Sequence, residues 1–225
     1  MVRGGWRSLL NDPQVRLFLI LAVGLVLLLI WHLMQTGLGF GQAVRQASFN
    51  GVSIMTGTGY VSANFSAWGG FATTILLIVM FIGGCGGSTT CGIKVFRLQV
   101  LASTAKVQIS RLLRPHAVVL AYYNKRPVSV EVMDSVMGFF YLFILGFVLI
   151  AIMLGIAGLD FVTALSGAAT SISNVGPGLG EVIGADGNFS TLPGSAKWIM
   201  TFAMLLGRLE IFTVLVMLNP AFWQR

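Results

Sequence analysis

The stretch SIMTGTGYV, residues Ser53–Val61, interrupts one of the most apolar parts of the chain. In a soluble protein, alternating threonine and glycine would predict a surface turn. Here one apolar run ends near Met34 and the next begins near Phe71. Irregular backbone cannot face lipid, because each unpaired amide or carbonyl costs several kcal/mol there, so it must line a watery path or be buried in protein. The fold therefore depends on what this string faces.

The composition is that of an integral membrane protein. Of the 225 residues, 56% are hydrophobic and 9% are charged, with a mean hydropathy of +0.88, whereas soluble domains carry about 25% charged residues. A net charge of +7 could indicate nucleic-acid binding, but the basic residues flank apolar runs, as the positive-inside rule predicts. We therefore expect membrane lipid and no nucleic acid as a partner.

The charge distribution also predicts an orientation. Of the 14 Lys and Arg residues, all except Arg45, Lys197 and Arg208 precede the first apolar run, fill the central connection or end the chain. This bias places both termini and the connection in the cytoplasm and predicts a multi-pass membrane protein.

Four apolar runs predict membrane spans. They lie near Leu17–Met34, Phe71–Ile82, Met137–Gly158 and Trp198–Leu218. A spanning helix needs about 20 residues, so the second run is too short unless the segment after it also lies in the membrane. Asp12 and Pro13 supply a helix start, and Lys94–Arg114 has apolar residues at helical spacing, which predicts a helix near the inner surface.

The two loops between paired spans, Gly41–Val61 and Leu159–Leu179, are moderately apolar and too short to cross and return as full helices. Each fits a re-entrant half-helix followed by an extended segment. A shift of 124 residues places Asn64-Phe65-Ser66 on Asn188-Phe189-Ser190, and it also pairs Gly70 with Gly194 and Gly83 with Gly207. A shift of 117 sets Thr56–Tyr60 over Ser173–Pro177.

These repeats predict an all-α membrane protein with two tandem span–pore-loop–span units. The predicted segments are a cytoplasmic N-terminal segment (1–16), a first repeat with a glycine-rich break (17–92), a basic cytoplasmic connection (93–130), a second repeat (131–219) and a cytoplasmic C-terminus (220–225).

The two matched strings are candidates for ion-binding backbone. Glycine permits positive φ, so successive carbonyls can turn toward one axis and replace the hydration shell of K⁺; the carboxyl end of the preceding half-helix adds negative potential. The first string comprises Thr56, Gly57, Thr58, Gly59 and Tyr60, and the second comprises Ser173, Asn174, Val175, Gly176 and Pro177. Both are close to the Thr-Val-Gly-Tyr-Gly filter of potassium channels. The alternative is a pair of glycine turns at helix ends.

A second feature is the glycine-rich loop, Gly83–Gly92 (GGCGGSTTCG). Its glycines, at about 1 kcal/mol each relative to alanine, predict a broken helix. We expect a flexible gate below the filter, formed by Gly83, Gly84, Gly86, Gly87, Ser88, Thr89, Thr90 and Gly92. Close helix packing through small residues is the alternative, and the two cysteines, Cys85 and Cys91, indicate neither a metal site nor a disulfide framework.

Arg208 lies inside the last apolar run, two residues before Glu210. An arginine at the bilayer centre costs about 2.5–3.5 kcal/mol on insertion scales, so it should point inward to a partner. Glu210 is a poor partner, because residues two apart do not share a helix face. The shift of 124 sets Arg208 level with Gly84, so Arg208 can hold the gate closed or act as a structural staple between helices.

At these residues the chain resembles the Trk/Ktr/HKT superfamily of potassium transporters, and within it the bacterial TrkH family. The resemblance covers essentially the whole chain and rests on five stretches: NDPQVR, TGTGY, FIGGCGGSTTCGIKVFR, SNVGPGLG and LLGRLEIFTVLVMLNPAFW. It implies one ion pathway built from four repeats, of which this chain matches repeats three and four. It also implies that Gly59 and Gly176 are filter glycines and that the glycine-rich loop and Arg208 form the gate.

Repeats one and two are absent, and two strings cannot close a four-sided filter. The chain is expected to be a piece of a longer product, to assemble with a separate first half, or to pair with a second copy. The resemblance implies a TrkA-like cytoplasmic nucleotide-binding regulator and a homodimer of the complete subunit. No bound cofactor is expected, with K⁺ the transported ion.

Two other functions stay open: a secondary transporter with a midplane solute site, and a non-conducting scaffold. An enzyme is not expected, since His32 and His116 lie far apart and the acidic residues are isolated.

Overall fold

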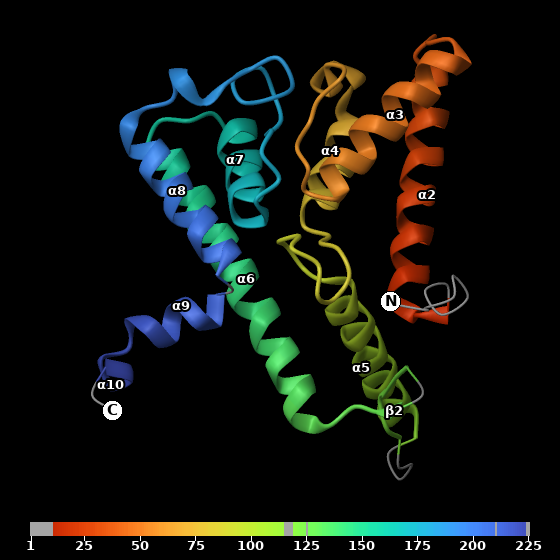
Figure 1. Ribbon diagram of the computed structural model, residues 1–225, viewed down its shortest axis with the longest axis vertical. Helices are drawn as coiled ribbons and strands as arrows, with labels where there is room; N and C mark the ends of the chain where they lie inside the picture. Colours follow the sequence, from red (N-terminus) through yellow and green to blue (C-terminus); the bar gives the residue numbers. More distant parts are fainter. Residues whose placement is uncertain (1–10, 115–118, 125, 210, 224–225) are drawn as a thin grey trace, which may run out of the picture.

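The structure is a computed structural model that describes residues 11–114, 119–124, 126–209 and 211–223. This part of the chain is mostly helical (Figure 1). The α-helices are α2 (Pro13–Gln35), α3 (Phe40–Met55), α4 (Gly70–Met80), α5 (Val95–Leu113), α6 (Val130–Ile156), α7 (Phe161–Ser173), α8 (Gly194–Arg208), α9 (Ile211–Leu218) and α10 (Pro220–Trp223). Two 3-10 turns (Phe65–Trp68, Phe189–Thr191) and two short strands, β1 (Tyr122–Tyr123) and β2 (Arg126–Pro127), complete it.

Helices α2 and α6 are long and apolar enough to cross a membrane. They have 23 and 27 residues, each with a mean hydropathy of 2.8 over its best window, and a hydrocarbon core of about 30 Å needs about 20 residues. The start of α2 is the predicted one: Asp12 Oδ1 accepts a hydrogen bond from the Gln14 amide at 2.8 Å, and Pro13 occupies the first turn. The first and third predicted spans are therefore helices of spanning length.

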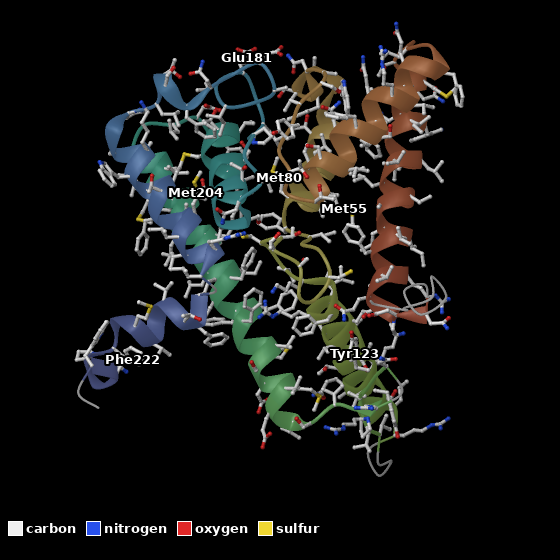
Figure 2. The ribbon with its side chains drawn as sticks, in the orientation of Figure 1. Met55, Met80, Tyr123, Glu181, Met204 and Phe222 are labelled. Atoms are coloured by element: carbon white, nitrogen blue, oxygen red, sulfur yellow. The ribbon has the colours of Figure 1, made fainter. Side chains whose placement is uncertain are left out.

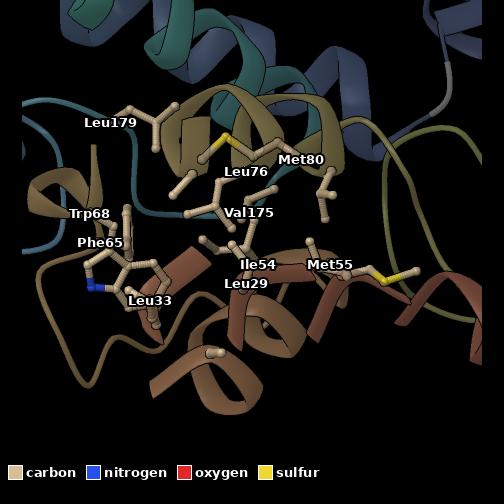
Figure 3. Packing of buried hydrophobic residues seen from close by; sticks show 14 of the residues in the cluster. Leu29, Leu33, Ile54, Met55, Phe65, Trp68, Leu76, Met80, Val175 and Leu179 are labelled. Carbon is tan, nitrogen blue, oxygen red and sulfur yellow. The ribbon is translucent and has the colours of Figure 1, made fainter. Parts of the chain in front are cut away.

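The chain forms two similarly arranged groups of three helices, α2–α3–α4 and α6–α7–α8, with the shorter α3 and α7 in the upper part of Figure 1. Apolar side chains of α2, α3 and α4 form one buried cluster (Figure 3). Val175 and Leu179, which follow α7, belong to this same cluster. A second cluster joins α6, α7 and α8. The two groups therefore share a core, and the segment after α7 links them.

The second apolar run ends early, as the glycine content predicted. Helix α4 stops at Met80 and α5 does not begin until Val95. The predicted helix over Lys94–Arg114 is confirmed as α5. The glycine-rich loop lies between these two helices. Its two ends are paired, because Ile82 and Ile93 form an isolated parallel bridge. Figure 1 shows this loop in the middle of the molecule, between the ends of α4 and α5.

The fourth apolar run is not one helix, and the prediction of a single span over Trp198–Leu218 is wrong. Helix α8 ends at Arg208, and α9 begins at Ile211 and leaves at a steep angle (Figure 1). Gly207 lies so close to the Ile172 carbonyl of α7 that an added Cβ would overlap it. The Arg208 side chain contacts the glycine-rich loop, as described below. Hydropathy alone did not reveal this break, because apolar residues continue on both sides of it.

The central basic connection contains a small hairpin that the sequence did not predict. Strands β1 and β2 pair antiparallel, with Tyr122 opposite Pro127 and Tyr123 opposite Arg126. Ser103 on α5 holds the hairpin: its Oγ donates to the Tyr122 carbonyl at 3.0 Å, and the Tyr122 amide lies 3.2 Å from the same Oγ. The hairpin is thus attached to α5 at the lower end of the molecule in Figure 1.

Candidate functional site

The first string begins where α3 ends, at Met55. The amides of Thr58 and Gly59 both donate to the Ser53 carbonyl, at 3.0 and 3.3 Å. Gly57 and Gly59 have φ of +67° and +76°, which is the left-handed region that glycine enters without strain. The chain therefore turns sharply out of the helix at these residues.

The second string repeats this geometry at the end of α7. The amides of Val175 and Gly176 donate to the carbonyl and the hydroxyl of Thr170, both at 3.0 Å. Asn174 and Gly176 have φ of +53° and +115°. Under the shift of 117, Asn174 corresponds to Gly57, Gly176 to Gly59 and Thr170 to Ser53. The two strings thus place left-handed residues and supporting hydrogen bonds at equivalent positions.

The residues just after each string are held by a polar side chain of the preceding helix. In the first loop, buried Asn50 donates to Ser62 Oγ at 3.0 Å and accepts from the Ser62 amide at 3.0 Å. In the second loop, buried Ser166 bonds the amide and carbonyl of Leu179 at 3.0 and 3.3 Å. Sequence reasoning missed these braces. The available signal was a polar residue within each half-helix, spaced 12 or 13 residues before the residue that it holds.

The two strings meet in space. An added Cβ on Gly59 would overlap the Val175 carbonyl oxygen, and an added Cβ on Gly176 would lie 3.7 Å from the Gly59 Cα. In the last turn of α7, the hydroxyls of Ser171 and Ser173 are buried without a hydrogen-bond partner among the described residues. The structure therefore brings the two strings predicted to bind an ion into contact at Gly59, Val175 and Gly176.

The glycine-rich loop lies beside the first string and is closed at its base. Thr90 Cγ2 would lie 3.6 Å from a Cβ added to Gly57. The Gly83 amide donates to the Ile93 carbonyl at 2.9 Å, and the Ile93 amide donates to the Phe81 carbonyl at 2.8 Å. These bonds tie the two ends of the loop together, so the residues between them project from a fixed base.

Glycine is required at several points of this loop. A Cβ on Gly83 would overlap the Cys91 carbonyl, and one on Gly84 would lie 2.8 Å from Ser88 Oγ. Gly87 and Gly92 have φ of +85° and +77°. The predicted gate residues Gly83, Gly84, Gly86, Gly87, Ser88, Thr89, Thr90 and Gly92 therefore form one compact loop.

Arg208 reaches this loop from the end of α8. Its Nη1 donates to the Thr89 carbonyl at 2.6 Å and lies 3.7 Å from Cys91 Sγ. Around this contact is a cavity of about 280 Å³. Its lining residues are Ser88, Thr89, Thr90, Cys91, Gly92, Lys94, Arg97, Phe139, Phe143, Gly207, Arg208 and Ile211. Glu210, which was considered as a partner for Arg208, lies outside the described residues, as do His116, Arg3, Arg7, Lys125 and Arg225.

The two groups of helices are also tied together at the end opposite the hairpin. Asn64 Nδ2 donates to Asp186 Oδ2 at 2.6 Å, and Ser66 Oγ donates to the Gly180 carbonyl at 3.1 Å. Glu181 lies at this end of the molecule (Figure 2). These bonds join the loop after the first string to the loop after the second.

The described residues contain no group of three or more His, Cys, Asp or Glu side chains suited to a metal ion. His32 Nε2 lies 2.7 Å from the Trp68 carbonyl, which gives this histidine a structural contact. At the start of α7, the hydrogen bond from Thr163 lowers the pKa of the exposed Asp160 carboxyl. The polar groups of the two strings and the glycine-rich loop are mainly backbone carbonyls and hydroxyls, and Lys94, Arg97 and Arg208 line the cavity beside them.

Comparison with known proteins identifies the family. The profile described as "TrkH: Cation transport protein" matches residues 4–225. The chain belongs to the TrkH family. It is 44% identical, over its full length, to the Trk system potassium uptake protein TrkI of Halomonas elongata. It is 35% identical, over 97% of its length, to the Trk system potassium uptake protein TrkH of Escherichia coli K12.

A solved structure agrees with the fold. The crystal structure of the potassium transporter TrkH from Vibrio parahaemolyticus matches 97% of this chain with a TM-score of 0.89 and 36% identity. Membership of a membrane transporter family, together with the long apolar helices α2 and α6, places the chain in a membrane.

The chain spans about half the length of the relatives it matches. It covers 46% of the Halomonas elongata protein, 44% of the Escherichia coli protein and 46% of the crystallised chain. The resemblance to half of a TrkH-type protein is thereby confirmed.

Proposed function

We propose that the chain forms half of a potassium-conducting pathway, in which the two strings supply two of four filter strands. The observation that carries the proposal is the recurrence of one backbone geometry, at equivalent residues, in two strings that touch. Gly57 with Gly59, and Asn174 with Gly176, hold the left-handed turns, and each string follows the carboxyl end of a short helix. Carbonyls presented in this way can replace the water around K⁺.

Each group of helices is proposed to be a span–pore-loop–span repeat. In the first, α2 and α4 flank the half-helix α3; in the second, α6 and α8 flank α7. Both half-helices enter the membrane from the side opposite the basic hairpin. This arrangement supports a filter that opens to the outside, with both termini in the cytoplasm, in the bacterial inner membrane. Segments 1–16, 93–130 and 220–225 are then cytoplasmic, and segments 17–92 and 131–219 are the repeats.

The glycine-rich loop is proposed to be the gate below the filter. It lies against the first string at Thr90 and Gly57, and Arg208 holds it through the Thr89 carbonyl. Glycine-rich backbone can move at low cost, because few side chains must repack when φ and ψ change. Release of the Arg208 bond would let the loop leave the pathway.

The missing strands are proposed to come from first-half repeats, in the same or a separate chain, and the complete subunit to form a homodimer. Helix α3 presents exposed Phe49 and Val52 beside a groove of about 500 Å³ that also includes Thr58 and Tyr60. This open side of the first string fits such a repeat. The basic cytoplasmic face fits a TrkA-like regulator. We propose no cofactor and no enzymatic reaction, with K⁺ as the transported ion.

Growth rescue of potassium-uptake-deficient bacteria by the complete assembly tests the proposal. Gly59→Asp should abolish rescue, because the side chain would meet the Val175 carbonyl and the carboxylate would sit in the ion path. Gly41→Asp is the matched control, since it adds the same charge in the first turn of α3, where nothing lies within 4 Å of the added Cβ. Undiminished rescue by Gly59→Asp would falsify the filter assignment, and absence of rescue by the unmodified assembly would favour a non-conducting role.

A further inference from the structure

The glycine-rich loop has a second attachment besides Arg208. On the side of α2, the Gly86 amide donates to Gln14 Oε1 at 2.6 Å. The loop is therefore held from two helices: Arg208 of α8 binds a carbonyl, and Gln14 of α2 binds an amide. Gln14 is 72 residues from Gly86 in the chain, so this contact comes from tertiary structure.

The backbone around Gln14 is rigidly placed. Asp12 caps the helix by accepting from the Gln14 amide at 2.8 Å, and Pro13 restricts the first turn. The Pro13 carbonyl accepts a hydrogen bond from Gln99 Nε2 of α5 at 2.8 Å. The start of α2 is thus attached to α5 as well as to the loop.

The Tyr123 hydroxyl on strand β1 lies near the Gln14 side chain and the Asp12 carboxylate. Burial, and then the nearby Asp12 carboxylate, raise the pKa of Tyr123, so the phenol stays protonated at neutral pH and keeps both donor and acceptor capacity. Figure 2 shows Tyr123 beside α5, toward the hairpin end of the molecule. Ser103 fixes the hairpin itself on α5.

We propose that Gln14 is a positioning residue that couples the β1–β2 hairpin to the glycine-rich loop, through Tyr123 on one side and the Gly86 amide on the other. The inference rests on the proposed function, in which this loop is the gate. A displacement of the hairpin or of α5 then acts on Gly86, while Arg208 retains Thr89. The loop closes when both attachments are made and loosens when the Gln14 attachment is lost.

The test uses the complete transporter that contains this chain, reconstituted in lipid vesicles, with two readouts. The first is the rate at which a membrane-permeant maleimide modifies Cys85, resolved from Cys91 by peptide mass spectrometry. The second is K⁺ flux in the absence of any regulator. Gln14→Leu should raise both several-fold, because it removes the acceptor for Gly86. Gln14→Glu keeps an acceptor at the same place and should stay near the unmodified protein.

Tyr123→Phe removes one oxygen and keeps the ring, so it tests the coupling even if Gln14→Leu fails to fold. It should raise Cys85 modification, by less than Gln14→Leu. Tyr122→Phe is the matched control, because Tyr122 meets Ser103 through its backbone, and it should change neither readout.

The inference is overturned if Tyr123→Phe leaves Cys85 modification unchanged, if Gln14→Leu leaves it unchanged, or if Gln14→Glu behaves like Gln14→Leu. Failure of the proposed function looks different, since the unmodified protein would then pass no K⁺ while the Cys85 readout still reports on the loop.

Discussion

The two loops that present the strings differ in how completely this chain encloses them. From Thr163 to Ser173, every residue of α7 except Leu165 is buried. Helices α4, α6 and α8 pack around α7. Helix α3 buries one side and leaves Phe49 and Val52 exposed. The second string thus finds its support within this chain, whereas the first has an open side.

This difference shows that similar backbone geometry can be held by unequal surroundings. Equivalent turns at Gly57 and Asn174 need only local hydrogen bonds and a residue that accepts positive φ. Burial of the helix behind each turn depends on what the rest of the assembly supplies. Under the proposed function, the first-half repeats cover the open side of α3.

The largest effect is expected from alanine substitution at the two matched glycines. Gly59→Ala puts a methyl group on the Val175 carbonyl and adds strain at a φ of +76°, so it should abolish K⁺ uptake. Gly176→Ala makes only an ordinary van der Waals contact, 3.7 Å from the Gly59 Cα, and adds backbone strain of about 1–3 kcal/mol, so uptake should fall less. Rubidium uptake by the complete assembly measures both variants. Equal losses of uptake would contradict the expectation that only a side chain at position 59 overlaps the opposite string.

Removal of the two braces should give the next largest effect. Asn50→Leu leaves the Ser62 amide and hydroxyl unpaired, and Ser166→Ala leaves the Leu179 amide and carbonyl unpaired. Each buried unsatisfied group costs about 1–3 kcal/mol. Both variants should lower the thermal unfolding temperature in detergent, and unchanged unfolding for either one would show that its brace is dispensable.

Exchange of residue types between the strings tests whether their turns are equivalent. Asn174 adopts φ of +53° where Gly57 adopts +67°, and asparagine tolerates this region better than other residues do. Gly57→Asn should therefore retain most uptake, whereas Gly57→Val, of similar size but β-branched, should lose it. The idea fails if the two variants are equally impaired.

The smallest effect concerns the starts of the two half-helices. Asp160 caps α7 by accepting from the Thr163 amide at 3.1 Å, while Gly39, at the start of α3, provides no side-chain cap. Because the pKa of Asp160 is lowered in the folded state, its contribution is present above the unfolded pKa of about 3.9. It is lost as the pH falls through the folded value.

Asp160→Asn should keep the cap and remove this acid dependence, measured as unfolding temperature between neutral pH and about pH 3. Gly39→Asp should add a few tenths of a kcal/mol to the stability of α3 at neutral pH. If the unfolding temperature of Asp160→Asn still falls at low pH, the acid dependence belongs to another carboxylate.

Several features followed from local chemistry and were predicted correctly. Asp12 and Pro13 start α2, the glycines of Gly83–Gly92 end α4, and α5 follows. The break between Arg208 and Ile211 was missed, because the apolar run resumes after Arg208 and Glu210 and is long enough overall for a single span. The braces of Asn50 and Ser166, the Gln14 contact and the hairpin were missed for another reason: their partners lie far along the chain, or the residues lie outside any apolar pattern.

The sequence by itself determined the membrane class, the helices of spanning length, the position of the glycine-rich break and the match between the strings, since these depend on hydropathy, glycine content and internal repetition. Only the tertiary structure decided that Gly59 meets Val175, that Arg208 and Gln14 hold the loop from two helices, and that α8 stops where it does. Those contacts join residues of separate helices, and their geometry is set by packing rather than by the preferences of neighbouring residues.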